Sequence, residues 1–256
     1  MKKILLLIAV AVLLAACGKT SADSSNELFI SAASSLTDAM LAVEKEFQKT
    51  HPAMELVFNF GSSGKLRNQI QQGAPVDLFL SASAKDMEIL QQEDLVNKQD
   101  IRNFAENRLV LASAEKLPET DLTELLSTSG KMIAVGEPES VPVGSYTKEA
   151  LSQIGLWEPL EGNLIFAKDA RQVLSYIESG NARIGIIYSS DASISSSIET
   201  IIDLPQEGVD IVYPAGIVSG SENKEAAEDF LDFLTSEEGQ KMLENYGFSS
   251  VKGELD

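Results

Sequence analysis

The sequence predicts an α/β fold, in which short buried strands alternate with amphipathic helices. Two kinds of segment support this prediction. Short apolar runs such as 55–60 (ELVFNF) are bounded by polar turn residues and have the length of strands. Between such runs, apolar residues recur at helical spacing, as in 36–47, where one face carries Leu36, Met40, Val43 and Phe47. Because parallel strands need crossover connections, this alternation favours a mostly parallel sheet.

The first half of the chain supplies three strand–helix units. The expected strands are 28–30, 55–60 and 76–80 (VDLFL). A helix is expected after each strand, and the last of these carries Met87 and Leu90 on its apolar face.

A second series of units begins at 108–112 (RLVLA). The further strands expected here are 132–135, 164–167, 184–188 and 210–218. Gly155 and Gly180 are typical helix-ending residues, and the C-terminal helix carries Ala226, Phe230 and Leu234. Periodicity fits two lobes or one large open sheet equally well.

The N-terminus has the pattern of a secretory signal. Lys2 and Lys3 precede an apolar run, 4–14, which is short of the roughly 20 residues that span a bilayer. The run leads to Cys17, the single cysteine, in a sequence that resembles the bacterial lipoprotein box. We therefore expect residues 1–16 to be a signal peptide, and 17–27 to be a lipidated Cys17 with a polar tether. An ordinary secretory signal followed by a free thiol is the alternative.

The chain is strongly acidic, with a formal net charge of −19 and 23% charged residues. Removal of the leader would take away two lysines and no acid, which makes the remainder more negative. Such a surface argues against binding nucleic acid or adsorbing to anionic lipid. It also argues against an anionic ligand, unless a site supplies local donors.

Small residues gather where four of the expected strands meet the next helix. These junctions are 31–36 (SAASSL), 61–66 (GSSGKL), 141–145 (VPVGS) and 168–171 (KDAR). Ligands of open α/β sheets bind at such junctions, where helix N-termini present free amide groups. Any one junction also fits a purely structural role, because serine is a common helix cap and glycine relieves tight turns.

Taken together, the motifs resemble the periplasmic molybdate-binding protein family. The matching blocks, in order, are SAASSLTDAM, FGSSGKLRNQI, GAPVDLFLSAS, VGEPESVPVGSYTKEAL, GIIYSSDA and a C-terminal YGF, and they cover residues 28–248. The resemblance implies a two-lobed periplasmic binding protein (type II-like) with the ligand in the interlobe cleft. It places 28–107 and 216–256 in lobe 1, and 108–215 in lobe 2.

The resemblance also implies a set of ligand positions. Ser35 and Ser63 would donate hydroxyls, Val143 and Ala170 backbone amides, and Tyr188 its phenol hydroxyl. Ser34 and Ser62 are the adjacent alternatives to the two serines. The family pattern has alanine in place of Val143 and valine in place of Ala170 in several members, which matters little where backbone groups act. The molybdenum would be held only as its oxyanion, with no protein–metal ligand and no cofactor.

A cage of neutral donors would let this acidic protein bind an anion, since such a cage needs no basic patch. It should prefer a fully deprotonated dianion, because a protonated phosphate brings a hydroxyl that finds no acceptor. Exclusion of sulfate would depend on cavity size, and molybdate and tungstate remain undistinguished. Sulfate or phosphate is therefore the alternative ligand. Lys65 and Arg171 stand beside ligand positions, where they either assist binding or serve as surface or interlobe charges.

Other function classes lack their residues. The chain has a single histidine, His51, and no G-x-S-x-G nucleophile motif, so an enzyme is not expected. No arginine fork for carboxylate and no tyrosine–histidine cluster for iron lies at the junctions. We expect a monomeric, lipid-anchored protein outside the cytoplasm that delivers its ligand to an ABC transporter permease. A sensor or adhesion lipoprotein is an alternative that the sequence does not test.

Overall fold

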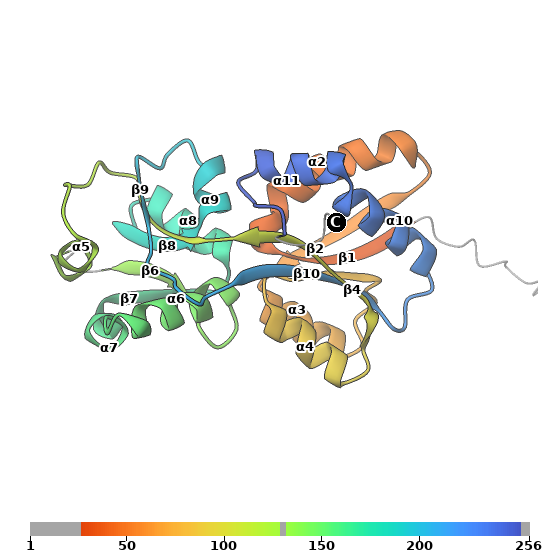
Figure 1. Cartoon of the computed structure of the whole chain (residues 1–256), viewed down its shortest axis with the longest axis horizontal. Helices are drawn as coiled ribbons and strands as arrows, with labels where there is room; N and C mark the ends of the chain where they lie inside the picture. The colour runs from red at the N-terminus through yellow and green to blue at the C-terminus, as the bar shows by residue number, and fades with distance from the viewer. Residues whose placement is uncertain (1–26, 129–131, 252–256) are drawn as a thin grey trace, which may run out of the picture.

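Two five-stranded sheets, each packed between helices, lie end to end along the long axis of the molecule (Figure 1). The computed structural model describes residues 27–128 and 132–251. We call the half built on the first sheet the first lobe, and the half built on the second sheet the second lobe. The expected signal peptide, Cys17 and most of the tether lie outside the described residues.

The first lobe contains a sheet with the order β2-β1-β3-β10-β4. Its strands are β1 (Glu27–Ala33), β2 (Glu55–Gly61), β3 (Leu78–Leu80), β4 (Val96–Asn107) and β10 (Ile211–Val218). Its helices are η1 (Ser34–Leu36), α2 (Thr37–Thr50), α3 (Ser63–Gln71), α4 (Ala84–Gln92), α10 (Lys224–Thr235) and α11 (Glu237–Asn245).

The second lobe contains a sheet with the order β7-β6-β8-β5-β9. Its strands are β5 (Leu109–Ser113), β6 (Ile133–Gly136), β7 (Leu164–Ala167), β8 (Ile184–Tyr188) and β9 (Thr200–Asp203). Its helices are α5 (Leu122–Thr128), α6 (Pro142–Gln153), α7 (Trp157–Leu160), η2 (Glu161–Asn163), α8 (Ala170–Glu178) and α9 (Ser189–Ile194).

The predicted α/β fold with two lobes is confirmed, and both sheets are mixed. In each sheet two strand pairs are parallel and two are antiparallel, so the sheets are less parallel than the sequence predicts. Each antiparallel pair includes β5 or β10, the two strands that follow a passage of the chain from one lobe to the other. The chain passes from β4 to β5 and from β9 to β10 without an intervening helix, which strand–helix alternation does not predict.

Helix α8 illustrates how local sequence builds these elements. Its buried face has helical spacing, with Ala170, Val173, Leu174 and Ile177 packed on the second sheet. Asp169 caps it by accepting a hydrogen bond from the Gln172 amide at 2.8 Å.

Two chain segments join the lobes. Arg108 alone separates β4 from β5, and residues 204–210 lead from β9 back to β10. The boundary expected at 215/216 falls inside β10, whose first residue, Ile211, already pairs with Asn107 of the first sheet. The exact division of the chain between lobes stays a prediction.

Two strands without a sequence signal, β4 and β9, lie at sheet edges. The outer part of β4 reads VNKQDIRN, and polar and charged residues are how proteins protect an edge from pairing with another chain. Such strands lack the apolar alternation on which the prediction depended. No helix in the described ranges has the length and apolar character needed to cross a bilayer.

Candidate functional site

A small cavity lies between the lobes, and the space of about 180 Å³ around it includes open solvent at its mouth. All five predicted ligand residues line it. Among the described residues, the lining consists of Ala33, Ser34, Ser35, Gly61, Ser62, Ser63, Ala82, Val141, Pro142, Val143, Ala170 and Tyr188. The first seven belong to the first lobe and the last five to the second, so the cavity exists only where the lobes meet.

Helix N-termini converge on this cavity from both lobes. Ser63 is the first residue of α3, and Ala170 is the first residue of α8. Val143 is the second residue of α6. The first amides of a helix have no partner within it, and the described residues supply no acceptor for the amides of Val143 and Ala170. These N–H groups and the helix dipoles together favour an anion at the cavity.

Each of the two predicted serine ligands also has a hydrogen-bond partner within the protein. The Ala82 amide donates to Ser63 Oγ at 2.9 Å, so the hydroxyl hydrogen of Ser63 stays available for another acceptor. Ser35 Oγ lies 2.9 Å from the Tyr213 hydroxyl. If Tyr213 donates in this pair, Ser35 is likewise left as a donor toward the cavity. Both serines are buried, so water does not compete for these hydroxyls.

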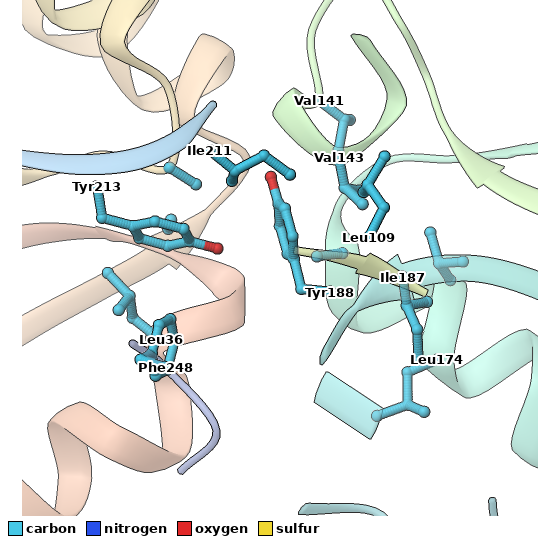
Figure 2. Packing of buried hydrophobic residues seen from close by; sticks show 14 of the residues in the cluster. Leu36, Leu109, Val141, Val143, Leu174, Ile187, Tyr188, Ile211, Tyr213 and Phe248 are labelled. Carbon is cyan, nitrogen blue, oxygen red and sulfur yellow. The ribbon is translucent and has the colours of Figure 1, made fainter. Parts of the chain in front are cut away.

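Tyr188 completes the donor set from the second lobe. Its side chain is buried, and its hydroxyl has no hydrogen-bond partner among the described residues. Burial, reinforced by the neighbouring Tyr213, raises the pKa of Tyr188 well above its ordinary value, so the hydroxyl keeps its proton. Figure 2 shows its ring facing the Tyr213 ring of the first lobe, whose hydroxyl points toward Tyr188; the ring centroids are 5.8 Å apart. An orphaned buried donor of this kind fits an absent acceptor.

Among the residues that the structure describes, no charged side chain lines the cavity. Lys65 is exposed and lies outside it. Arg171 also lies outside, and its guanidinium contacts the Ser34 carbonyl and the Asp38 carboxylate instead. In the described part of the chain, no group of histidine, cysteine and acidic residues has the arrangement of a metal site.

Close backbone approach explains the glycines of two motifs. A Cβ on Gly144 would lie 2.1 Å from the Gly136 carbonyl oxygen, so only glycine lets the start of α6 sit against the end of β6. A Cβ on Gly64 would lie 2.7 Å from the Ser140 carbonyl oxygen, which belongs to the other lobe. The GSSG glycine is therefore an interlobe contact as well as a helix residue.

Sequence reasoning undervalued Ser34 and Ser62, which both line the cavity. Ser62 is the N-cap residue of α3, yet its side chain makes no capping bond and its buried Oγ has no partner in the described structure. Its hydroxyl is therefore a further candidate donor. The signal was present in the doubled serines of SAASSL and GSSGKL, but the sequence does not tell which serine faces a ligand.

A family model described as bacterial extracellular solute-binding protein matches residues 28–249. The molybdate-binding protein ModA of Haemophilus influenzae is 37% identical over 95% of this chain and 97% of its own. A putative ABC transporter substrate-binding lipoprotein of Bacillus subtilis, YvgL, is 36% identical over 93% of this chain and 94% of its own.

A solved structure supports the fold. The periplasmic molybdate-binding protein of Azotobacter vinelandii matches with a TM-score of 0.81 over 88% of this chain and all of its own, at 24% identity. The predicted resemblance to molybdate-binding proteins is thus confirmed by relatives of that name along nearly the whole chain. With the family model covering both lobes, the chain belongs to the bacterial extracellular solute-binding proteins.

Proposed function

We propose that this protein captures molybdate or tungstate outside the cytoplasm and delivers it to the membrane permease of an ABC importer. The observation that carries the proposal is the neutral donor cage between the lobes, in which all five predicted ligand positions meet. Relatives that carry the name molybdate-binding protein support the choice of ligand.

In the proposed site, Ser35, Ser63 and Tyr188 donate hydroxyls, and Val143 and Ala170 donate backbone amides. Charge-assisted hydrogen bonds contribute about 1.5–3 kcal/mol each. Five of them, set against an association cost of about 4–15 kcal/mol, are compatible with micromolar or tighter binding. The cage needs no catalytic group, and the family consists of binding proteins rather than enzymes.

All five groups would act as donors toward the ligand, which favours a bare dianion. A protonated phosphate would require one hydroxyl to accept instead of donate, and would so lose a charge-assisted hydrogen bond worth about 1.5–3 kcal/mol. Sulfate is also a bare dianion and would be discriminated by the size of the cavity. Another tetrahedral oxyanion, sulfate before phosphate, is therefore the second candidate ligand.

Binding would proceed by closure of the lobes. The ligand bridges donors of both lobes and shifts the population from open to closed, with rotation at Arg108 and at residues 204–210. The radius of gyration from X-ray scattering should decrease when molybdate is added. Identical scattering profiles with and without molybdate would rule closure out.

The proposal includes a location and a working state. The protein would be a monomer held at the outer face of a membrane by lipid on Cys17. The lipoprotein name of the Bacillus subtilis relative supports the anchor.

Calorimetric titration tests the ligand. A chain that begins after Cys17 retains both lobes and is titrated with molybdate, tungstate, sulfate and phosphate in turn. We expect molybdate and tungstate to bind one-to-one, and sulfate and phosphate to give no heat of binding. Heat from sulfate or phosphate alone would identify that anion as the ligand. No heat from any of the four would reject oxyanion capture.

A further inference from the structure

Arg171 connects the two lobes without entering the cavity. It lies on α8 of the second lobe, and its side chain is 28% exposed. Its Nε donates to the Ser34 carbonyl oxygen at 3.2 Å, and its Nη2 donates to the Asp38 carboxylate. Ser34 and Asp38 both belong to the first lobe, so one guanidinium holds two groups on the far side of the cleft.

The same guanidinium has a second neighbour within its own lobe. Asp191 of α9 is fully buried, and its Oδ1 lies 3.7 Å from Arg171 Nε. Neither carboxylate oxygen of Asp191 has a hydrogen-bond partner in the described ranges. Arg171 is therefore the cation that compensates this buried acid, and the attraction between them fixes where the guanidinium sits.

The surroundings of Asp191 increase its dependence on Arg171. Asp38 and Asp169 are like charges near it, and the phenols of Tyr188 and Tyr213 are its other titratable neighbours. Burial raises the pKa of Asp191 to about 7, Arg171 lowers it, and Asp38 and Asp169 raise it.

We infer that Arg171 is a positioning residue for the oxyanion cavity: anchored beside Asp191, it holds Ser34 and Asp38 of the opposite lobe and keeps the lobes closed over the ligand. The inference rests on the proposed function, which supplies the ligand. Arg171 acts through Ser34, a cavity residue and the neighbour of Ser35, and never touches the oxyanion itself.

The contacts of Arg171 with the opposite lobe differ from an ordinary surface ion pair because they form only when the two lobes are closed. Arg102 and Asp232 also form an ion pair, but both belong to the first lobe and stay together whether the cleft is open or closed. The contacts of Arg171 with Ser34 and Asp38 break when the lobes separate. They therefore favour the closed, ligand-bound state and should slow ligand release.

The test compares Asp38→Asn with the control Asp232→Asn, since both remove one exposed carboxylate from an arginine. We expect Asp38→Asn to weaken molybdate binding about two- to tenfold, mostly through faster dissociation. The midpoint of thermal unfolding of the ligand-free protein should change little, because without ligand only the fraction of molecules with closed lobes forms this exposed contact. Asp232→Asn should leave molybdate affinity unchanged.

Arg171→Lys provides a second variant, which keeps a cation beside Asp191 but lacks the planar fork that reaches two acceptors. It too should speed molybdate dissociation, and combining it with Asp38→Asn should add little. If the unaltered protein binds molybdate and both variants release it at the unaltered rate, the positioning role of Arg171 is overturned and the proposed function stands.

If the unaltered protein binds no oxyanion, the proposed function fails and closure becomes the readout. The ligand-free radius of gyration should then be larger for Asp38→Asn than for the unaltered chain. Equal values would reject the positioning role of Arg171.

Discussion

The hydroxyl of Tyr213 lies 2.9 Å from Oγ of Ser35 and links a predicted ligand position to a strand that leads out of the lobe crossover. The same hydroxyl lies 3.4 Å from Nδ2 of Asn107, the last residue of β4. Asn107 in turn accepts a hydrogen bond from Ser189 of the second lobe at 3.0 Å. A polar chain therefore runs from the cavity wall to the point where the backbone passes between the lobes.

Tyr213→Phe should weaken molybdate binding about fivefold, because Ser35 loses the group that orients its hydroxyl. The ring contacts with Phe104, Tyr188 and Phe248 are kept, so the fold should be preserved. Calorimetry measures the affinity, and circular dichroism checks the fold. An affinity equal to that of the unaltered protein would mean that Ser35 needs no orienting partner.

Much of the fold could be predicted because local patterns determine its elements. The buried face of α2 was readable as Met40, Val43 and Phe47, and β8 as an apolar run with the predicted bounds. The strand expected at 28–30 is part of β1, which extends to Ala33. The motifs also placed all five ligand positions around one cavity. The edge strands β4 and β9 were missed because most of their residues are exposed or only partly buried and do not give a clear apolar alternation.

The remainder of the site depends on contacts between residues distant in the chain. Tyr213 reaches Ser35 across 178 positions, and Arg171 reaches Ser34 across 137. No local pattern marks either contact, since a buried tyrosine and a partly exposed arginine are ordinary on their own elements. The sequence left open whether Arg171 assists binding, and only the packing of the two lobes gives it a defined neighbourhood.

Ser63→Ala should weaken molybdate binding about tenfold or more, since it removes one charge-assisted donor. It also leaves the Ala82 amide without its acceptor. The matched variant is Ser62→Ala, which removes a cavity hydroxyl that has no protein partner. We expect the smaller loss from Ser62→Ala in calorimetric titrations. The reverse order would assign the ligand role to Ser62.

Gly64→Ala should weaken molybdate binding without destabilising the ligand-free protein. The new methyl group would lie 2.7 Å from the Ser140 carbonyl oxygen of the other lobe, so the lobes could not close fully. Within α3, alanine is a better helix former than glycine by about 1 kcal/mol. Gly162→Ala is the control, because its Cβ meets nothing within 4 Å. Full compaction of Gly64→Ala by molybdate in X-ray scattering would contradict this prediction.

The pH dependence of stability should reveal the buried carboxyl of Asp191. Burial raises its pKa in the folded protein to about 7, from an ordinary value of 3.8. Between these values the folded state holds a proton that the unfolded state has lost. The stabilising contribution is therefore complete below the ordinary pKa and is lost as the pH rises through about 7.

Asp191→Asn removes this titration while keeping the side chain's size. The free energy of unfolding of the two proteins should therefore change differently with pH. From pH 5 to pH 7, the free energy of unfolding of the unaltered protein should fall relative to that of Asp191→Asn, by at most about 1.4 kcal/mol per pH unit. Urea unfolding of both ligand-free proteins across this range measures the difference. Parallel curves would show that Arg171 alone keeps Asp191 ionised, since a carboxyl with an ordinary pKa does not titrate in this range.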